Sequence, residues 1–198
     1  MSYILRDGTG GSYLAKVSPE NRQHTVAITQ TTQEQAAIDG RAYNLNTGDI
    51  TLTDAVDTPV MYLKNNNDQD LVISAVACGF GASDGTAGDP NTITLVRNPT
   101  AGTIITSTPT DIDMNQNRNY GSSLTLLVDA YKGATGDTMT DGSDIIQIYQ
   151  TESGRMFASI VEILPKGKSI GIKIKPPATN SSMRCYAAII AHLHSENI

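Results

Sequence analysis

The stretch Ser169-Ile170-Gly171-Ile172-Lys173-Ile174-Lys175, followed by Pro176-Pro177, carries the pattern that decides the fold. Three isoleucines alternate with glycine and lysine, so one face of the segment is apolar and the other is polar. The run stops at the two prolines, because proline cannot donate a hydrogen bond to a neighbouring strand. The stretch therefore predicts a half-buried β-strand.

Similar runs, separated by turn-forming residues, fill the chain after residue 48. We expect strands at 50–53, 59–64, 70–80, 92–97, 103–107, 123–130, 144–149, 155–164, 170–175 and 181–194. Since no helix-length segment lies between them, the crossovers that parallel strands need are missing and the sheets should be antiparallel. Two sheets that each hide one face predict an all-β antiparallel sandwich, with a jelly-roll or related Greek-key order.

The first 40 residues differ from the rest because they are rich in glycine and neutral polar residues and show little periodicity. We expect an extended N-terminal arm at 1–40 that binds a capsid or another subunit, and a sandwich domain at 41–198. Within the arm, a strand at 24–31 and a helical turn at 34–38 are possible, but neither would be stable alone. Three long loops, at 81–91, 108–122 and 132–143, are expected to contact other molecules.

Composition excludes several classes of protein. The chain has 198 residues, a formal net charge of −6 and a pI of about 4.9, which argues against binding to nucleic acid. No apolar run approaches the roughly 20 residues of a membrane-spanning helix, and the first residues lack the apolar core of a signal peptide, so we expect synthesis in the cytoplasm. Cys78 and Cys185 lie in apolar runs, where buried thiols are favoured over a disulfide.

Candidate catalytic groups are few. The histidines are His24, His192 and His194, and no serine lies in a Gly-x-Ser-x-Gly motif, so we expect no enzyme, no catalytic residue and no cofactor. His192 and His194 would share a strand face with Arg184 and Tyr186. They could supply half of a zinc or nickel site, but a polar outer face or a subunit contact is the preferred interpretation.

Two acidic segments could offer oxygen ligands to calcium. They contain Asp84 and Asp89 in one case, and Asp137, Asp141 and Asp144 in the other. Neither has the EF-hand spacing, and Asp-Gly or Gly-Asp pairs are typical of tight turns. The turn interpretation is preferred, and no metal site is predicted.

Aromatic residues argue against sugar binding. Trp is absent and the only phenylalanines are Phe80 and Phe157, which weakens both glycosidase and lectin interpretations. Tyr120 and Tyr131 lie in or beside long loops. Each either anchors an interface or covers one end of the sandwich.

The chain also resembles small virion proteins of tailed bacteriophages. The resemblance begins in the stretches 4–11, 14–17 and 20–22, and continues in Ala42-Tyr43-Asn44-Leu45-Asn46-Thr47-Gly48 with Ile50-Thr51-Leu52-Thr53, Tyr62-Leu63-Lys64-Asn65-Asn66, Val96-Arg97-Asn98-Pro99-Thr100, Asp129-Ala130-Tyr131-Lys132-Gly133-Ala134 and Leu164-Pro165-Lys166-Gly167. These stretches cover nearly the whole chain, but they contain no catalytic or ligand-binding signature.

The resemblance implies a capsid decoration protein, also called an auxiliary or cement protein. Such a protein is a jelly-roll-like domain that sits as a homotrimer on the outside of the phage head, binds the major capsid protein and stabilises the expanded shell. Its partners would be the capsid and other copies of itself, with no nucleic acid and no membrane, and its location would be the virion. The alternative is a head-fibre or tail adsorption module that binds host-surface glycans; a hydrolase is the weakest interpretation.

Overall fold

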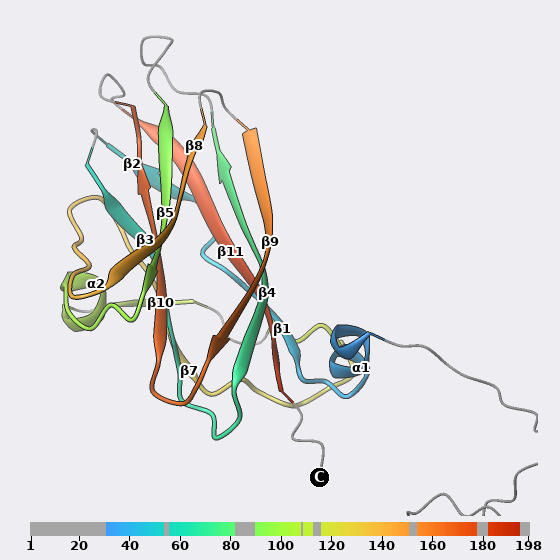
Figure 1. Ribbon diagram of the computed structural model, residues 1–198. Helices are drawn as coiled ribbons and strands as arrows, with labels where there is room; N and C mark the ends of the chain where they lie inside the picture. The colour runs from blue at the N-terminus through green and yellow to red at the C-terminus, as the bar shows by residue number, and fades with distance from the viewer. Residues whose placement is uncertain are drawn as a thin grey trace, which may run out of the picture. The chain divides into compact units, whose positions relative to one another are not determined.

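A computed structural model describes residues 31–53, 56–81, 90–107, 109–112, 116–150, 154–177 and 182–194 (Figure 1). These residues form two antiparallel sheets and two short helices, as the alternating pattern predicts. The strands are β1 Ala42–Asn46, β2 Ile50–Leu52, β3 Thr58–Asn65, β4 Leu71–Phe80, β5 Asn91–Arg97, β6 Thr110–Asp111, β7 Val128–Lys132, β8 Ser143–Gln150, β9 Gly154–Leu164, β10 Ser169–Lys175 and β11 Met183–Leu193. The helices are α1 Thr32–Ile38 and α2 Thr103–Thr106.

The strand order follows from pairing the first half of the chain with the second half. β1 and β2 pair with β11, β3 with β10, β4 with β9 and β5 with β8, all antiparallel. The strand pairs are therefore nested, with the first strands pairing with the last. They form one sheet with the order β1-β11-β4-β9 and a second sheet that contains β3-β10-β5-β8. The predicted sandwich is therefore confirmed, and its strand order is that of a jelly roll.

The core lies between the two sheets and is built from the inward faces of the strands. Ile170, Ile172 and Ile174 are each at most 2% exposed, and Lys175 on the other face is exposed. The alternation predicted for β11 is also confirmed, since its buried face carries Met183, Cys185, Ala187, Ile189, Ala191 and Leu193. Period-two alternation was therefore a reliable guide to which side chains enter the core.

One side of the sandwich is closed by the long insertion between β5 and β8. Part of this insertion, β7, pairs with the edge of β3, and β6 pairs with β7. Another part runs along β1, where the backbone N–H of Asn44 donates to Gln116 O and that of Arg118 donates to Ala42 O, each at 2.9 Å. The insertion thus covers the edges of both sheets on the β1–β3 side.

The same insertion covers the outer face of the second sheet. Tyr62, Val96, Ile104 and Met139 form a small buried cluster there, separate from the main core. Gly171 faces outward, as predicted, yet it is buried because the thioether of Met139 lies against it. The loop predicted at 132–143 to contact another molecule therefore supplies Met139 to the fold itself.

The prediction of a strand at 103–107 is wrong, because Thr103–Thr106 form helix α2. The β-branched residues favour a strand locally, but the chain reverses at Gly102, which has φ 120°. Thr106 Oγ1 then donates to Gly102 O at 3.0 Å, and the Thr103 backbone N–H donates to Thr138 Oγ1 at 3.1 Å. Tertiary hydrogen bonds decide the conformation here.

Two further boundaries differ from the sequence prediction. The strand predicted at 123–130 begins only at Val128, because residues 122–127 run without regular pairing. β1 was not predicted as a strand, although its buried residues Ala42, Tyr43 and Leu45 enter the core. Both errors lie where short polar-rich segments depend on distant partners.

Helix α1 is longer than the helical turn predicted at 34–38. Its Ala36 is buried, and Asn119 Nδ2 donates to Ile38 O at 2.8 Å. Asn117 Nδ2 donates to Gly40 O at 2.6 Å. Residues 32–40 are therefore held by the insertion. Residues 1–30 of the predicted arm, which include nearly all of the strand predicted at 24–31, lie outside the described residues.

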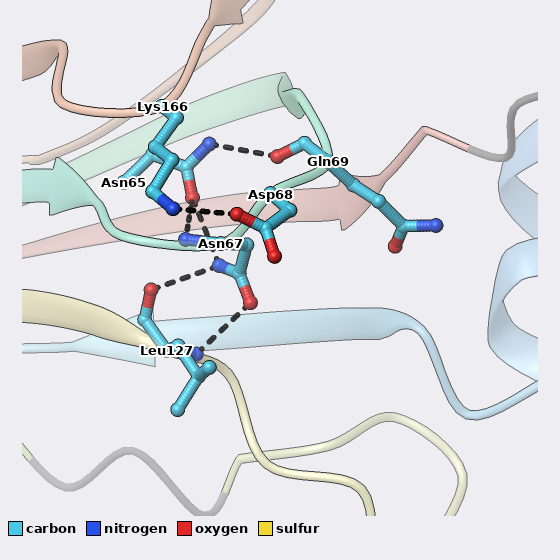
Figure 2. Close-up of polar contacts among 6 residues, drawn as sticks. All are labelled: Asn65, Asn67, Asp68, Gln69, Leu127 and Lys166. Atoms are coloured by element: carbon cyan, nitrogen blue, oxygen red, sulfur yellow. Dashed lines mark hydrogen bonds and ion pairs between the residues drawn. The ribbon is translucent and has the colours of Figure 1, made fainter.

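A buried amide network holds the turn between β3 and β4 (Figure 2). Asn65 Nδ2 donates to Gln69 O and to Leu164 O, while its Oδ1 accepts from the backbone and side-chain N–H groups of Asn67. Asn67 in turn donates to Leu127 O at 2.9 Å. Since buried polar groups must be paired, these amides join the ends of three separate segments.

Candidate interaction surface

The histidines do not form a site. His192 is buried, and its Nδ1 lies 3.2 Å from Ser74 Oγ. Burial lowers the pKa of His192, and the nearby positive charges of His194 and Arg41 lower it further. His194 is exposed, and His24 lies outside the described residues. Among the residues that the structure describes, no three His, Cys, Asp or Glu side chains gather as metal ligands.

Of the three aspartates of the second acidic segment, Asp137 stabilises a turn through its side chain. Asp137 accepts hydrogen bonds from Thr103 Oγ1 at 2.9 Å and from the backbone N–H of Ala134 at 2.7 Å. Asp141 has φ 62°, the left-handed conformation of a tight turn, and Asp144 lies on β8. Asp84 and Asp89 lie outside the described residues.

Both cysteines are free thiols in the core, as predicted. Burial raises the pKa of Cys78 and of Cys185 to about 12 in each case. A thiol must ionise to act as a nucleophile. Neither residue is therefore a reactive group in the folded protein at neutral pH.

The two loop tyrosines have different environments. The Tyr131 ring stacks on Tyr62, with centroids 5.8 Å apart and planes inclined by 8°, so it covers part of the fold. Tyr120 is fully exposed. Of the two, only Tyr120 is available to a partner.

The sandwich is open on the side opposite the insertion. β8 and β9 are the outermost strands of their sheets there, and no strand among the described residues pairs with the outer edge of either (Figure 1). The core is only partly covered at this side. Apolar side chains of β8 and β9 that pack on the core but remain half-buried are Ile145, Ile146, Ile148, Met156 and Ile160. We call the edges of β8 and β9 with these side chains the open side.

The outward face of β9 is also apolar. Phe157, Val161 and Ile163 are 65%, 77% and 58% exposed, and they alternate with the half-buried residues that face the core. Tyr149 at the end of β8 is 64% exposed. Monomeric proteins rarely expose contiguous apolar surface of this kind unless it is an interaction site.

Sequence reasoning identified β9 as a strand but missed this surface. The signal was present, because residues 156–164 are apolar at both odd and even positions except for Ser159 and Glu162. Such a run is typical of a strand that is covered on both faces. Here one face is uncovered.

A cavity with charged residues lies beside the start of β9. Arg155 of β9 and Arg184 of β11 line a cavity of about 500 Å³ together with Asp49, Tyr186 and residues around Phe80. The Arg184 guanidinium lies 3.8 Å from the Asp49 carboxylate, and both side chains are largely exposed. An exposed pair of this kind contributes little to stability, so these groups are available to a polar partner.

Comparisons with known proteins give only distant structural matches. No protein-family model matches the sequence, and no curated protein matches it. Among solved structures, the chain is similar to a mutant VP2 protein of infectious bursal disease virus in derived T=1 particles, with 9% identity, a TM-score of 0.20 and coverage of 79% of this chain and 41% of that chain. The VP2 subviral particle of the same virus matches with 10% identity, a TM-score of 0.20 and coverage of 79% and 42%. The chain spans about two fifths of the length of these proteins.

Proposed function

We propose that this chain is a structural protein of a virion, and more specifically a decoration protein that binds the major capsid protein on the outside of a tailed-phage head. The proposal assigns it no enzymatic activity. The observation that carries it is the open side, where apolar groups of the core and of β9 remain uncovered. This surface suits adhesion to other protein chains better than it suits a reaction.

The jelly-roll sandwich is consistent with this role. It presents rigid sheets and several turns at each end, and the polar groups that we described in those turns are mostly paired with the fold. Within the described part of the chain, no helix has the length and apolar character needed to cross a bilayer.

Three of the stretches that resemble phage virion proteins meet at one end of the sandwich. The backbone N–H of Asn65 donates to Lys168 O at 3.0 Å, and that of Gly167 donates to Asn65 O at 2.7 Å. Asn66 Nδ2 donates to Asp129 Oδ1 at 2.9 Å. Residues from three of the stretches are therefore joined by hydrogen bonds, which supports a shared fold as the origin of the resemblance.

The physical role of a decoration protein follows from linkage. A ligand that binds only the expanded shell stabilises that state, because binding shifts the equilibrium toward it. Many weak contacts per shell add up through multivalency. We propose that residues 1–30 bind neighbouring capsid subunits. Residues 32–40 are already bound to the insertion by hydrogen bonds.

Electron microscopy of labelled virions tests this function. An antibody raised against the purified chain should label the heads of the phage that carries it, and purified chain should sediment with expanded heads but not with unexpanded ones. A pre-immune serum and an unrelated sandwich domain are the controls. Labelling confined to the tail, or equal binding to both forms of the head, would contradict the proposal.

A further inference from the structure

We propose that two copies of this chain pair antiparallel through β9, so that the sheet β1-β11-β4-β9 continues from one copy into the other across the open side. The inference deepens the proposed function, because it names the partner that covers this side. It rests on the edges, the area and the charges of β8 and β9.

The edge of β9 carries little of the protection that exposed edges usually have. Such edges are normally blocked by lysine, by proline or by a bulge. β9 has eleven residues and contains neither lysine nor proline. It has a bulge between Ser159 and Glu162, opposite the segment Ile73–Ala75 of β4, but the alternation of exposed and half-buried side chains continues through it. No described strand pairs with the outer edge of β9, so the backbone groups on that edge can pair with another strand.

The area of the open side is close to what a stable pair needs. An eleven-residue strand is about 36 Å long, and two sheets about 10 Å apart with their side chains are roughly 20 Å wide. The open side therefore offers roughly 700 Å² per copy, against about 800 Å² for a standard interface. Pairing would also bury the half-exposed core residues, such as Met156 and Ile160.

The exposed residues of β9 are compatible with a two-fold axis at Ser159. This residue is the midpoint of the outward stripe Arg155, Phe157, Ser159, Val161 and Ile163. In an antiparallel pair centred there, Phe157 of one copy lies opposite Val161 of the other, and Arg155 lies opposite Ile163.

The charges select the antiparallel arrangement. β9 carries Arg155 near one end and Glu162 near the other, and Asp144 of β8 directly precedes Ile145, which lines the same cavity as Glu162. A parallel pair in register would set arginine against arginine and glutamate against glutamate, which is unfavourable. The antiparallel pair places no like charges of β9 opposite each other.

A second copy is the occupant that these features favour. An isologous contact uses the same surface on both chains, and the stripe matches itself when reversed. A pair with a two-fold axis differs from the homotrimer that the phage resemblance implies, so the mass of the purified chain distinguishes them.

Substitutions of Ser159 test the pairing directly on the full-length chain. Wild-type protein should have the mass of two copies by analytical ultracentrifugation. Ser159→Lys and Ser159→Glu should each weaken pairing by about tenfold or more, because like charges meet at the axis. An equal mixture of the two variants should pair again, and Ser123→Lys, at an exposed serine of the insertion, should pair like the wild type.

A cysteine at the axis gives a geometric test. Opposite Cα atoms of an antiparallel pair are about 4.5–5.5 Å apart, within the range of a disulfide. Ser159→Cys should therefore form a covalent dimer with oxidised glutathione, while Ser123→Cys should not. The native thiols are buried and remain protonated, so they do not compete.

The measured masses and crosslinks decide whether the chain pairs through β9. Melting curves check that every variant is folded, since Ser159 is exposed and its replacement should leave the single copy intact. A wild-type mass of one or three copies, failure of the mixed variants to pair, or no crosslink at residue 159 overturns the inference. Because no capsid is present, these results do not depend on head binding: a paired chain that labels tails contradicts only the proposed function.

Discussion

The side-chain amide of Asn65 donates a 2.8 Å hydrogen bond to the backbone carbonyl of Leu164, 99 residues further along the chain. Through this contact, the turn after β3 fixes the end of β9. The amide group of Asn65 is fully used, with both N–H bonds donated and the oxygen accepting from Asn67.

Replacing Asn65 by alanine should therefore destabilise the fold strongly. The buried carbonyl of Leu164 and the partly buried carbonyl of Gln69 would each lose a donor, which costs about 3 kcal/mol and lowers the melting temperature by about 10 °C. Asn66→Ala is the matched control, since Asn66 makes one partly exposed bond to Asp129 and its loss should cost less than about 1 kcal/mol. Urea unfolding measures both, and equal losses would contradict the role of the network.

Two glycines should respond differently to alanine. A methyl group on Gly133 would collide with the backbone oxygen of Pro59, which cannot move without disturbing β3. We expect Gly133→Ala to lose about 2–3 kcal/mol of stability. A methyl group on Gly171 would collide with the flexible end of Met139 and lie 3.4 Å from Pro99 Cγ, so Gly171→Ala should cost less than about 1 kcal/mol. Thermal unfolding of the two variants measures both losses of stability. A larger loss for Gly171→Ala than for Gly133→Ala would contradict the prediction.

The buried His192 predicts a loss of stability in mild acid. Burial lowers its pKa in the folded protein, so the folded state keeps the ring neutral while the unfolded chain takes up a proton below about pH 6.5. This contribution to stability is therefore present above pH 6.5 and is lost as the pH falls below it. Urea midpoints between about pH 7.5 and pH 5 measure the effect.

The exposed neighbour His194 provides the control for this prediction. His192→Gln should flatten the pH dependence, whereas His194→Gln should keep most of it. An unchanged slope in the His192 variant would assign the acid sensitivity to other groups.

Truncation should separate the first 30 residues from the sandwich. A chain of residues 31–198 keeps α1 and the acceptors of Asn117 and Asn119, so its melting temperature should stay close to that of the full chain. A chain of residues 41–198 leaves both side-chain amides without these partners and should melt several degrees lower. If residues 1–30 bind the capsid, neither truncated chain will sediment with expanded heads. Normal binding by the chain of residues 31–198 would show that residues 1–30 are not needed for capsid binding.

Much of the fold could be predicted from the sequence. Alternation in β10 and β11 identified the strands and their buried faces, because burial of one sheet face acts directly on every second residue. α2 was missed because its conformation depends on Gly102 and Thr138 rather than on its own residues. β1 was missed because its partner β11 lies at the other end of the described chain.

The interaction surface was less accessible to sequence reasoning. An apolar run such as β9 is compatible with burial inside the fold or with burial by a partner, and local periodicity does not distinguish these. Only the burial of the side chains in the folded chain shows which face of β9 is left uncovered. His192 has the same strand parity as Arg184 and Tyr186, but it is buried beside Ser74 where the sequence favoured an exposed polar face.

The place of β11 has a consequence for synthesis on the ribosome. This strand comes last among the described strands, yet it lies in the middle of its sheet between β1 and β4, and the backbone N–H of Ala187 reaches Thr47 Oγ1, 140 residues earlier. Until β11 emerges, β1 and β4 have no neighbour on that side and the sheet is split in two. Nascent chains that stop before residue 183 thus expose the unpaired edges of β1 and β4 to chaperones and proteases. Only chains translated past β11 can complete this sheet and enter an assembly.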